Sequence, residues 1–349
     1  MSSLQKELFK KRNATEETNE QKENDDLAPL QSPSLFKRGQ PSAKYAPVSW
    51  DKYFDTYQDV AIPDTSDVFR VYRINGSANA NTPVFIFHHG AGHSALSFAL
   101  TASHIREMTN GECSIIALDA RGHGDTRTSN DTDYSLSTLS DDLVNVIQAL
   151  YNGQDTPDLC LVGHSMGGSV VVDVTSRKRL KNVVGVCVLD VVEGSAMDAL
   201  SSMTSILNTR PQRFKTIEQA VQWSVRSNTV RNLESAKVSV PPLVRSTDDD
   251  ALGWRTDLIK TKPFWTEWFT DLSSKFLACP AAKLLILAGT DRLDKPLMIG
   301  QMQGKFQLHI IPEAGHFLQE DAPVNTARSL VEFWRRNKRL VLPPKVQIK

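Results

Sequence analysis

A serine stands between two glycines in the segment Gly163-His164-Ser165-Met166-Gly167. The pattern Gly-x-Ser-x-Gly is typical of a sharp turn between a strand and a helix, where the serine hydroxyl is exposed as a nucleophile. An apolar run at residues 159–162 precedes the motif, and a helix-compatible stretch follows it to about residue 180. Glycine at 163 and 167 removes the Cβ atoms that would clash at such a turn. The motif alone also fits an ordinary small-residue turn, but its context predicts a nucleophilic Ser165.

A second glycine-containing loop could stabilise the charge that forms during attack on a carbonyl group. The apolar strand expected at residues 84–88 runs into His89-Gly90-Ala91-Gly92-His93. This sequence resembles the oxyanion-hole loop of the α/β-hydrolases. The backbone N–H groups of Ala91 and Met166 would then donate to the carbonyl oxygen of a substrate. The loop by itself fits an ordinary strand-to-helix turn equally well. Its histidines suggest a metal cluster, but no matching carboxylate pattern accompanies them.

Serine needs a base within hydrogen-bond reach and an acid that orients that base. His316 follows the last expected strand in a loop that contains a glycine, and it is the predicted base. His123, in the polar loop at residues 119–125, is a minor alternative. The acid could be Asp190, or Asp291 or Asp294 one strand later. Spacing cannot choose between them, and the order of elements by itself favours Asp291.

Strands and helices alternate along most of the chain. Apolar runs predict strands at residues 84–88, 114–118, 159–162, 183–189, 283–288 and 306–311, and residues 69–74 alternate like a half-exposed strand. Helices are expected at residues 94–108, 135–151 and 321–337. Near-continuous apolar strands between helices indicate a doubly wound, mostly parallel sheet, whose functional sites lie at the carboxyl ends of the strands. Ser165, Ala91 and Asp190 all fall at such ends.

The alternation breaks in the middle of the chain. Residues 195–280 are rich in polar helix formers and scattered aromatic residues, which suggests a helical cap inserted into a core of residues 43–194 and 281–340. The tryptophans of this insertion are expected mainly in its core. Residues 246–250 are expected to form a loop. Residues 1–42 are too polar to bury much surface and are predicted to be mostly disordered. Residues 341–349 are basic and are expected to form a solvated tail.

Charge and cysteine content exclude several classes of function. Lys and Arg together number 40, as do Asp and Glu, so the chain has no net charge to attract nucleic acid or an anionic membrane. The longest apolar runs are too short to cross a bilayer. The four cysteines show no metal-ligand spacing. The first residues lack the apolar core of a signal peptide. We therefore expect a protein of the cytosol or nucleus without a metal site.

Four stretches closely resemble the protein phosphatase methylesterases, and the resemblance covers about residues 48–335. They are residues 190–200, 231–236, 288–295 and 299–306, of which the first and last are far more specific than the hydrolase motifs. In that family the acid corresponds to Asp190, so the resemblance moves the assignment from Asp291 to Asp190. Relatives can carry a long acidic insertion where this chain has a short loop at residues 247–250.

The resemblance implies an α/β-hydrolase fold and an enzyme without a cofactor. It would demethylate the C-terminal leucine methyl ester of the protein phosphatase 2A catalytic subunit, using Ser165, His316 and Asp190. Two alternatives stay open at this point. One is a serine hydrolase of small esters or thioesters, and the other is a catalytically silent module that binds the phosphatase.

Overall fold

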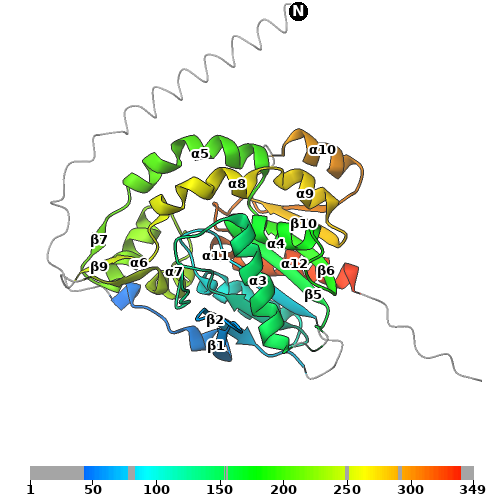
Figure 1. Cartoon of the computed structure of the whole chain (residues 1–349). Coiled ribbons are helices and arrows are strands. Elements are labelled where there is room, and N and C mark those ends of the chain that lie inside the picture. The colour runs from blue at the N-terminus through cyan, green and yellow to red at the C-terminus, as the bar shows by residue number, and fades with distance from the viewer. Residues whose placement is uncertain are drawn as a thin grey trace, which may run out of the picture. The chain divides into compact units, whose positions relative to one another are not determined.

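An eight-stranded sheet forms the centre of the computed structural model (Figure 1). The structure describes residues 43–77, 83–152, 154, 156–247, 251–289 and 293–338. The strand order is β1-β2-β4-β3-β5-β6-β10-β11; β1–β2 and β2–β4 are antiparallel, and the other pairs are parallel. The strands are β1 (Thr56–Ala61), β2 (Val68–Ile74), β3 (Val84–His88), β4 (Ser114–Leu118), β5 (Leu159–His164), β6 (Val183–Leu189), β10 (Ala282–Leu287) and β11 (Gln307–Ile310). The expected mostly parallel sheet is confirmed, whereas β1 was not predicted.

The central strands are apolar throughout because both faces of the sheet are covered. In β3, Val84 and Ile86 belong to one hydrophobic core, and Phe85 and Phe87 belong to the other. Successive side chains of a strand point to opposite faces, so a strand buried on both sides must be apolar at every position. His88, the last residue of β3, is therefore also buried, at the carboxyl edge of the sheet.

Helices cover both faces of the sheet. Residues of α3 (Leu136–Tyr151) and α4 (Met166–Ser176) contribute to the first core, and residues of α2 (Ala99–Met108) and α12 (Pro323–Asn337) contribute to the second. The short helices η3 (Ala95–Phe98) and α11 (Leu318–Asp321) complete the second side. Ser135 caps α3 by accepting a hydrogen bond from the Thr138 N–H, which explains where that helix begins.

The described residues between β6 and β10 form five α-helices, two short 3-10 helices and a small sheet. Its elements are α5 (Glu193–Asn208), β7 (Arg213–Phe214), α6 (Ile217–Arg226), α7 (Leu233–Ser239), η4 (Pro241–Leu243), β8 (Val244–Ser246), β9 (Leu252–Trp254), η5 (Leu258–Phe264), α8 (Trp265–Phe269) and α9 (Leu272–Ala278). The antiparallel sheet β7-β9-β8 was not expected in a helical cap. Ser246, expected in a loop, instead ends β8 and pairs with Leu252. The strands are only two or three residues long, too short to produce an alternating sequence pattern.

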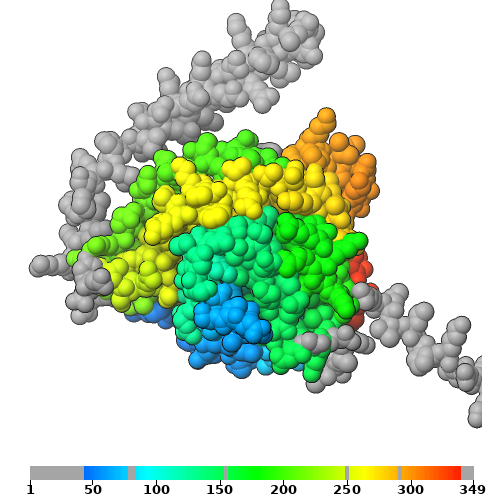
Figure 2. Space-filling view, in the orientation of Figure 1, coloured from blue at the N-terminus to red at the C-terminus, as the bar shows by residue number. Residues whose placement is uncertain are grey.

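The inserted segment packs on the rest of the chain through its aromatic residues. Trp265 and Trp268 are buried in the first core, and Trp268 Nε1 donates a hydrogen bond of 2.8 Å to the Tyr134 carbonyl. In Figure 2 the yellow segment around α8 adjoins the teal segment of α3 on the surface. A third cluster of buried residues, which includes Phe214 and Val221, lies within the insertion itself.

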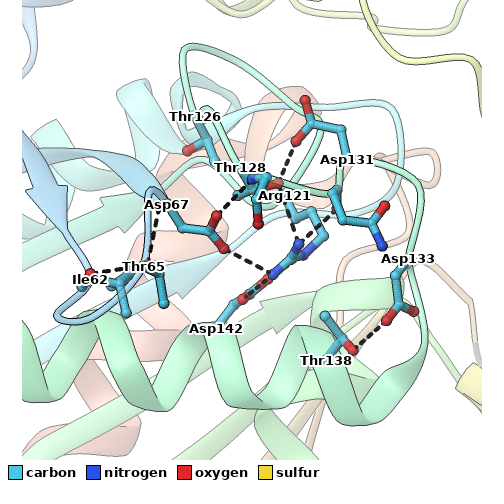
Figure 3. A network of polar contacts seen from close by, with 12 residues as sticks. Ile62, Thr65, Asp67, Arg121, Thr126, Thr128, Asp131, Asp133, Thr138 and Asp142 are labelled. Atoms are coloured by element: carbon cyan, nitrogen blue, oxygen red, sulfur yellow. Dashed lines mark hydrogen bonds and ion pairs between the residues drawn. The ribbon is translucent and has the colours of Figure 1, made fainter.

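A network of charged residues fixes the loop after β4 (Figure 3). Arg121 forms a two-point ion pair with Asp142 of α3, at 2.9 and 2.7 Å, and a longer contact of 3.6 Å with Asp67. Burial raises the pKa of Asp142 to about 6, and the Arg121 guanidinium partly offsets that effect. Planar guanidinium–carboxylate pairs of this kind set both position and orientation. The network therefore holds residues 119–125 at the carboxyl edge of the sheet.

Residues 1–42 and 341–349 lie outside the described residues, as do residues 248–250 of the expected loop. Within the described part of the chain, no helix has the length and apolar character needed to cross a membrane. The four cysteines are all free and buried. The Sγ atoms of Cys160 and Cys187 lie 3.7 Å apart inside the second core.

Candidate active site

Ser165 occupies a strained turn between β5 and α4. Its φ and ψ angles are 51° and −119°. A Cβ atom added to Gly163 would lie 2.1 Å from the Gly167 carbonyl oxygen, and one added to Gly167 would lie 2.3 Å from the carbonyl oxygen of His88. Between residues 159 and 175, Ser165 alone is not buried. The sequence therefore folds here so that a single hydroxyl group emerges from the core at a helix N-terminus.

Asp190 follows the neighbouring strand β6 and contacts the predicted base. Its Oδ2 atom lies 2.8 Å from His316 Nδ1, and its Oδ1 atom accepts a hydrogen bond of 3.0 Å from the Ala288 N–H. The Asp190 side chain is 1% exposed, whereas that of His316 is 45% exposed. A buried carboxylate at this distance favours the tautomer of His316 that carries its proton on Nδ1. Nε2 is then the ring nitrogen that can accept a proton.

Three contacts position the loop that carries His316 after β11. The buried His164 ring donates from Nε2 to the His316 carbonyl oxygen at 2.9 Å. The Asp321 carboxylate accepts a hydrogen bond of 2.8 Å from the Gly315 N–H. Arg231, from the inserted segment, donates from Nη1 to the Glu313 carbonyl oxygen at 2.9 Å. The position of the imidazole is thus set by the backbone on both sides of it as well as by Asp190.

Ser165 and His316 both belong to the described residues, and no hydrogen bond joins them in this structure. Catalytic hydrogen bonds of this type are often long or poorly aligned until the substrate is bound. The structure therefore brings the predicted acid and base into direct contact, and it places the predicted nucleophile just after β5, the strand that pairs with β6, which Asp190 follows. A Cβ atom added to Gly90, in the predicted oxyanion loop, would lie 3.1 Å from Ser165 Cβ, so that loop borders the serine.

Of the two alternative acids, Asp294 caps a helix and Asp291 lies outside the described residues. Asp294 caps α10 (Lys295–Met302): its Oδ1 atom accepts a hydrogen bond of 3.1 Å from the Leu297 N–H. Its Oδ2 atom accepts a hydrogen bond of 2.6 Å from Ser273 Oγ. Both oxygens of Asp294 are therefore used in holding helices. Asp291, which the order of elements favoured, lies outside the described residues.

Two buried histidines hold the predicted oxyanion loop. His123 Nε2 accepts a hydrogen bond of 2.8 Å from the Gly92 N–H, and His89 Nε2 accepts one of 2.9 Å from the Ala120 N–H. Their Nδ1 atoms contact carbonyl oxygens of Arg121 and Gly90, at 2.7 and 2.8 Å, so each ring is neutral with its proton on Nδ1. Burial lowers the pKa of His123 to about 4. His123 is thus unsuited to be the base, because both of its ring nitrogens are occupied.

The backbone donors proposed for the oxyanion hole are available. Among the described residues, the N–H groups of Ala91 and Met166 have no hydrogen-bond acceptor. Met166 is the first residue of α4, so its N–H belongs to the unpaired first turn of that helix. No group of three or more His, Cys, Asp or Glu side chains in the described part of the chain could hold a metal ion.

Several supporting residues had no role in the sequence analysis. His164 was noted only as part of the serine motif, although its position next to the nucleophile could have indicated a role in the site. Asp119 accepts hydrogen bonds from the Ala95 and Asp125 N–H groups at 2.7 and 2.9 Å, and burial raises its pKa to about 6. Arg231 lay in a stretch that carried a family resemblance, but no pattern indicated its contact with the base loop.

Comparison with known proteins decides the family. The alpha/beta hydrolase family matches residues 85–329. Protein phosphatase methylesterase 1 of Yarrowia lipolytica is 47% identical over 337 residues, which cover 90% of this chain and 80% of that protein. The human protein of the same name is 40% identical over 338 residues, which cover 84% of this chain and 86% of that protein. The chain belongs to the protein phosphatase methylesterase family.

As a member of the methylesterase family, the protein is a carboxylic ester hydrolase with the α/β-hydrolase fold, as the sequence predicted. Solved structures agree on the fold. The E-2-(acetamidomethylene)succinate hydrolase has a TM-score of 0.64 at 20% identity, over 80% of this chain and 99% of that one. An esterase of Mycobacterium tuberculosis has a TM-score of 0.56 at 21% identity, over 79% of this chain and 92% of that one.

Proposed function

We propose that this methylesterase removes the methyl group from the C-terminal leucine methyl ester of the protein phosphatase 2A catalytic subunit. The proposal is supported by the relatives named protein phosphatase methylesterase 1. The observation that carries its chemistry is the 2.8 Å contact between His316 Nδ1 and Asp190 Oδ2, beside the strained turn at Ser165. We expect the enzyme to act in the cytosol or nucleus, without a metal or cofactor.

In the proposed mechanism Ser165 Oγ attacks the ester carbonyl while His316 Nε2 accepts the hydroxyl proton. Asp190 keeps the proton on Nδ1 and stabilises the imidazolium that forms. The Ala91 and Met166 N–H groups donate to the oxyanion, each lowering the barrier by about 3 kcal/mol. His316 then protonates the departing methoxide, and methanol leaves an acyl-enzyme on Ser165. Water then gives a proton to His316 Nε2 and attacks the acyl carbonyl. The bond between that carbon and Ser165 Oγ breaks, His316 returns the proton to Oγ, and the leucine carboxylate is released.

Mass spectrometry of the phosphatase tail tests this proposal. The methylated catalytic subunit is incubated with wild-type enzyme and with Ser165→Ala, and loss of one methyl group is expected only with the wild type. A fluorophosphonate probe should label the wild-type serine and not the variant. Labelling without demethylation of the phosphatase, together with fast hydrolysis of a short-chain ester, would identify a hydrolase of small esters instead. Absence of labelling would indicate a binding module without catalytic activity.

A further inference from the structure

The guanidinium of Arg210, in the inserted segment, lies over the ring of Trp254. Its guanidinium carbon is 3.7 Å from the centroid of the Trp254 ring. Trp254 is itself held in place, because its Nε1 donates a hydrogen bond of 2.7 Å to the Pro211 carbonyl. The rings of Phe214 and Trp223 contact it edge-to-face at 5.3 and 5.6 Å. A guanidinium that stacks on an aromatic ring can still donate hydrogen bonds from the N–H groups at its edges.

No acidic partner accompanies this guanidinium. Among the described residues, the Arg210 side chain forms no ion pair and no hydrogen bond. Burial alone lowers its pKa to about 10. Arg121, by contrast, is paired with Asp142 and Asp67. A half-buried cation without a counter-ion is costly for the folded protein, so its presence calls for a partner that arrives from outside.

The Arg210–Trp254 pair lies beside the candidate active site. Two residues after Trp254, Thr256 Oγ1 donates a hydrogen bond of 2.7 Å to the Gly122 carbonyl. Two residues further on, Leu258 packs so closely on the oxyanion loop that a Cβ atom added to Gly92 would lie 2.7 Å from it. The positive charge of Arg210 also lowers the pKa of His93, in the same loop, although burial is the larger cause.

We infer that Arg210 binds a carboxylate of the substrate tail next to the ester that is cleaved. The planar guanidinium offers two parallel N–H donors, which match the two oxygens of a carboxylate. The carboxylate has two sources: an acidic side chain a few residues before the ester, or the C-terminal carboxylate that hydrolysis releases. The first would make Arg210 a determinant of substrate specificity, and the second a cause of product inhibition. The inference rests on the proposed hydrolysis of a C-terminal methyl ester.

Peptides that end in leucine methyl ester test the first source. One peptide carries a single Asp at one of the four positions before the leucine, and its partner carries Asn there. Wild type should have a higher kcat/KM for the Asp peptide than for the Asn peptide. Arg210→Gln should lower the ratio of these two kcat/KM values about tenfold, mainly because KM for the Asp peptide rises. The control is Arg226→Gln, which removes an exposed charge from the same segment and should leave the ratio unchanged.

Inhibition by free peptides tests the second source. The peptide acid should inhibit wild type more strongly than the peptide amide, and Arg210→Gln should abolish that difference. The same pair of peptides, titrated into Ser165→Ala with and without Arg210→Gln, measures binding without catalysis. If Arg210→Gln does not fold, Arg210→Lys keeps the charge but loses the planar fork and should reduce the ratios partially. Unchanged ratios in both experiments would overturn the inference, whereas an inactive wild type would instead refute the proposed function.

Discussion

Ser165 and Asp190 follow neighbouring parallel strands, and both have a positive φ angle, at 51° and 50°. The Ser165 N–H donates a hydrogen bond of 3.1 Å to the carbonyl of Leu189, the residue before Asp190. The Asp190 N–H donates in turn to the Ile286 carbonyl at 2.8 Å. The two strained residues are thus held by the sheet itself, which absorbs the cost of their conformations. The relative position of nucleophile and acid is a property of the strand pairing.

Asp190→Asn should lower kcat by about 10⁴-fold, because an amide in that position favours the wrong tautomer of His316. Asp294→Asn should leave kcat nearly unchanged and reduce the free energy of unfolding by about 1 kcal/mol or less, since Asp294 caps α10. Asp291→Asn should retain activity. The measurements are methanol release and urea unfolding. If Asp291→Asn were as inactive as Asp190→Asn, the assignment of the acid to Asp190 would fail.

Gly163→Ala should destabilise the protein by about 3 kcal/mol or more, because its Cβ atom would overlap backbone atoms that cannot move away. Gly289→Ala is the matched control: its Cβ atom would meet no described residue within 4 Å, and the change should alter stability by less than about 0.5 kcal/mol. Urea unfolding of both variants measures the difference. Equal stability of the two variants would contradict the close approach of backbone at the serine turn.

His123→Ala should weaken the oxyanion loop without removing a reacting group. The Gly92 N–H would lose its buried acceptor, which costs about 1–3 kcal/mol of stability, and kcat should fall because the Ala91 donor is less well placed. His104→Ala, at a partly exposed pair with Glu107 on α2, should change stability by less than about 0.5 kcal/mol. A His123→Ala variant with wild-type kcat would show that this hydrogen bond does not support catalysis.

Glu320 should make stability depend on pH. It is fully buried 3.5 Å from His93 Nδ1, and burial raises its pKa to about 8 from an ordinary value near 4.5. Below pH 4.5 the folded and unfolded states both carry the proton, whereas between pH 4.5 and 8 only the folded state keeps it. Its contribution to the free energy of unfolding therefore falls by up to about 1.4 kcal/mol per pH unit across that range.

Glu320→Gln removes this titration and tests the prediction. The variant should become progressively more stable relative to wild type as the pH is raised from 5 to 8. Urea unfolding at several pH values measures the difference, and Glu234→Gln, an exposed carboxylate on α7, is the control. Parallel stability curves for Glu320→Gln and wild type would show that Glu320 is already ionised in the folded protein.

The sequence alone determined the features that arise from local geometry. Glycine spacing around Ser165 predicted the strained turn, because only glycine tolerates the approach of backbone at 163 and 167. Apolar runs predicted the central strands, because strands buried on both faces cannot alternate. Short strands such as β7 and β8 carry too few residues to show a period, and they were missed.

The tertiary structure decided what depends on contacts between distant segments. Asp190 and His316 are 126 positions apart, and no spacing rule chooses between Asp190 and a later aspartate. Family resemblance indicated Asp190, and the parallel pairing of β6 with β5 and β10 is what physically places it beside His316. The histidines at 89 and 123 suggested a metal cluster or a base from their residue type. Their buried contacts with backbone N–H groups make them supports of the loop, because a ring with both nitrogens occupied has no free position for a proton or a metal.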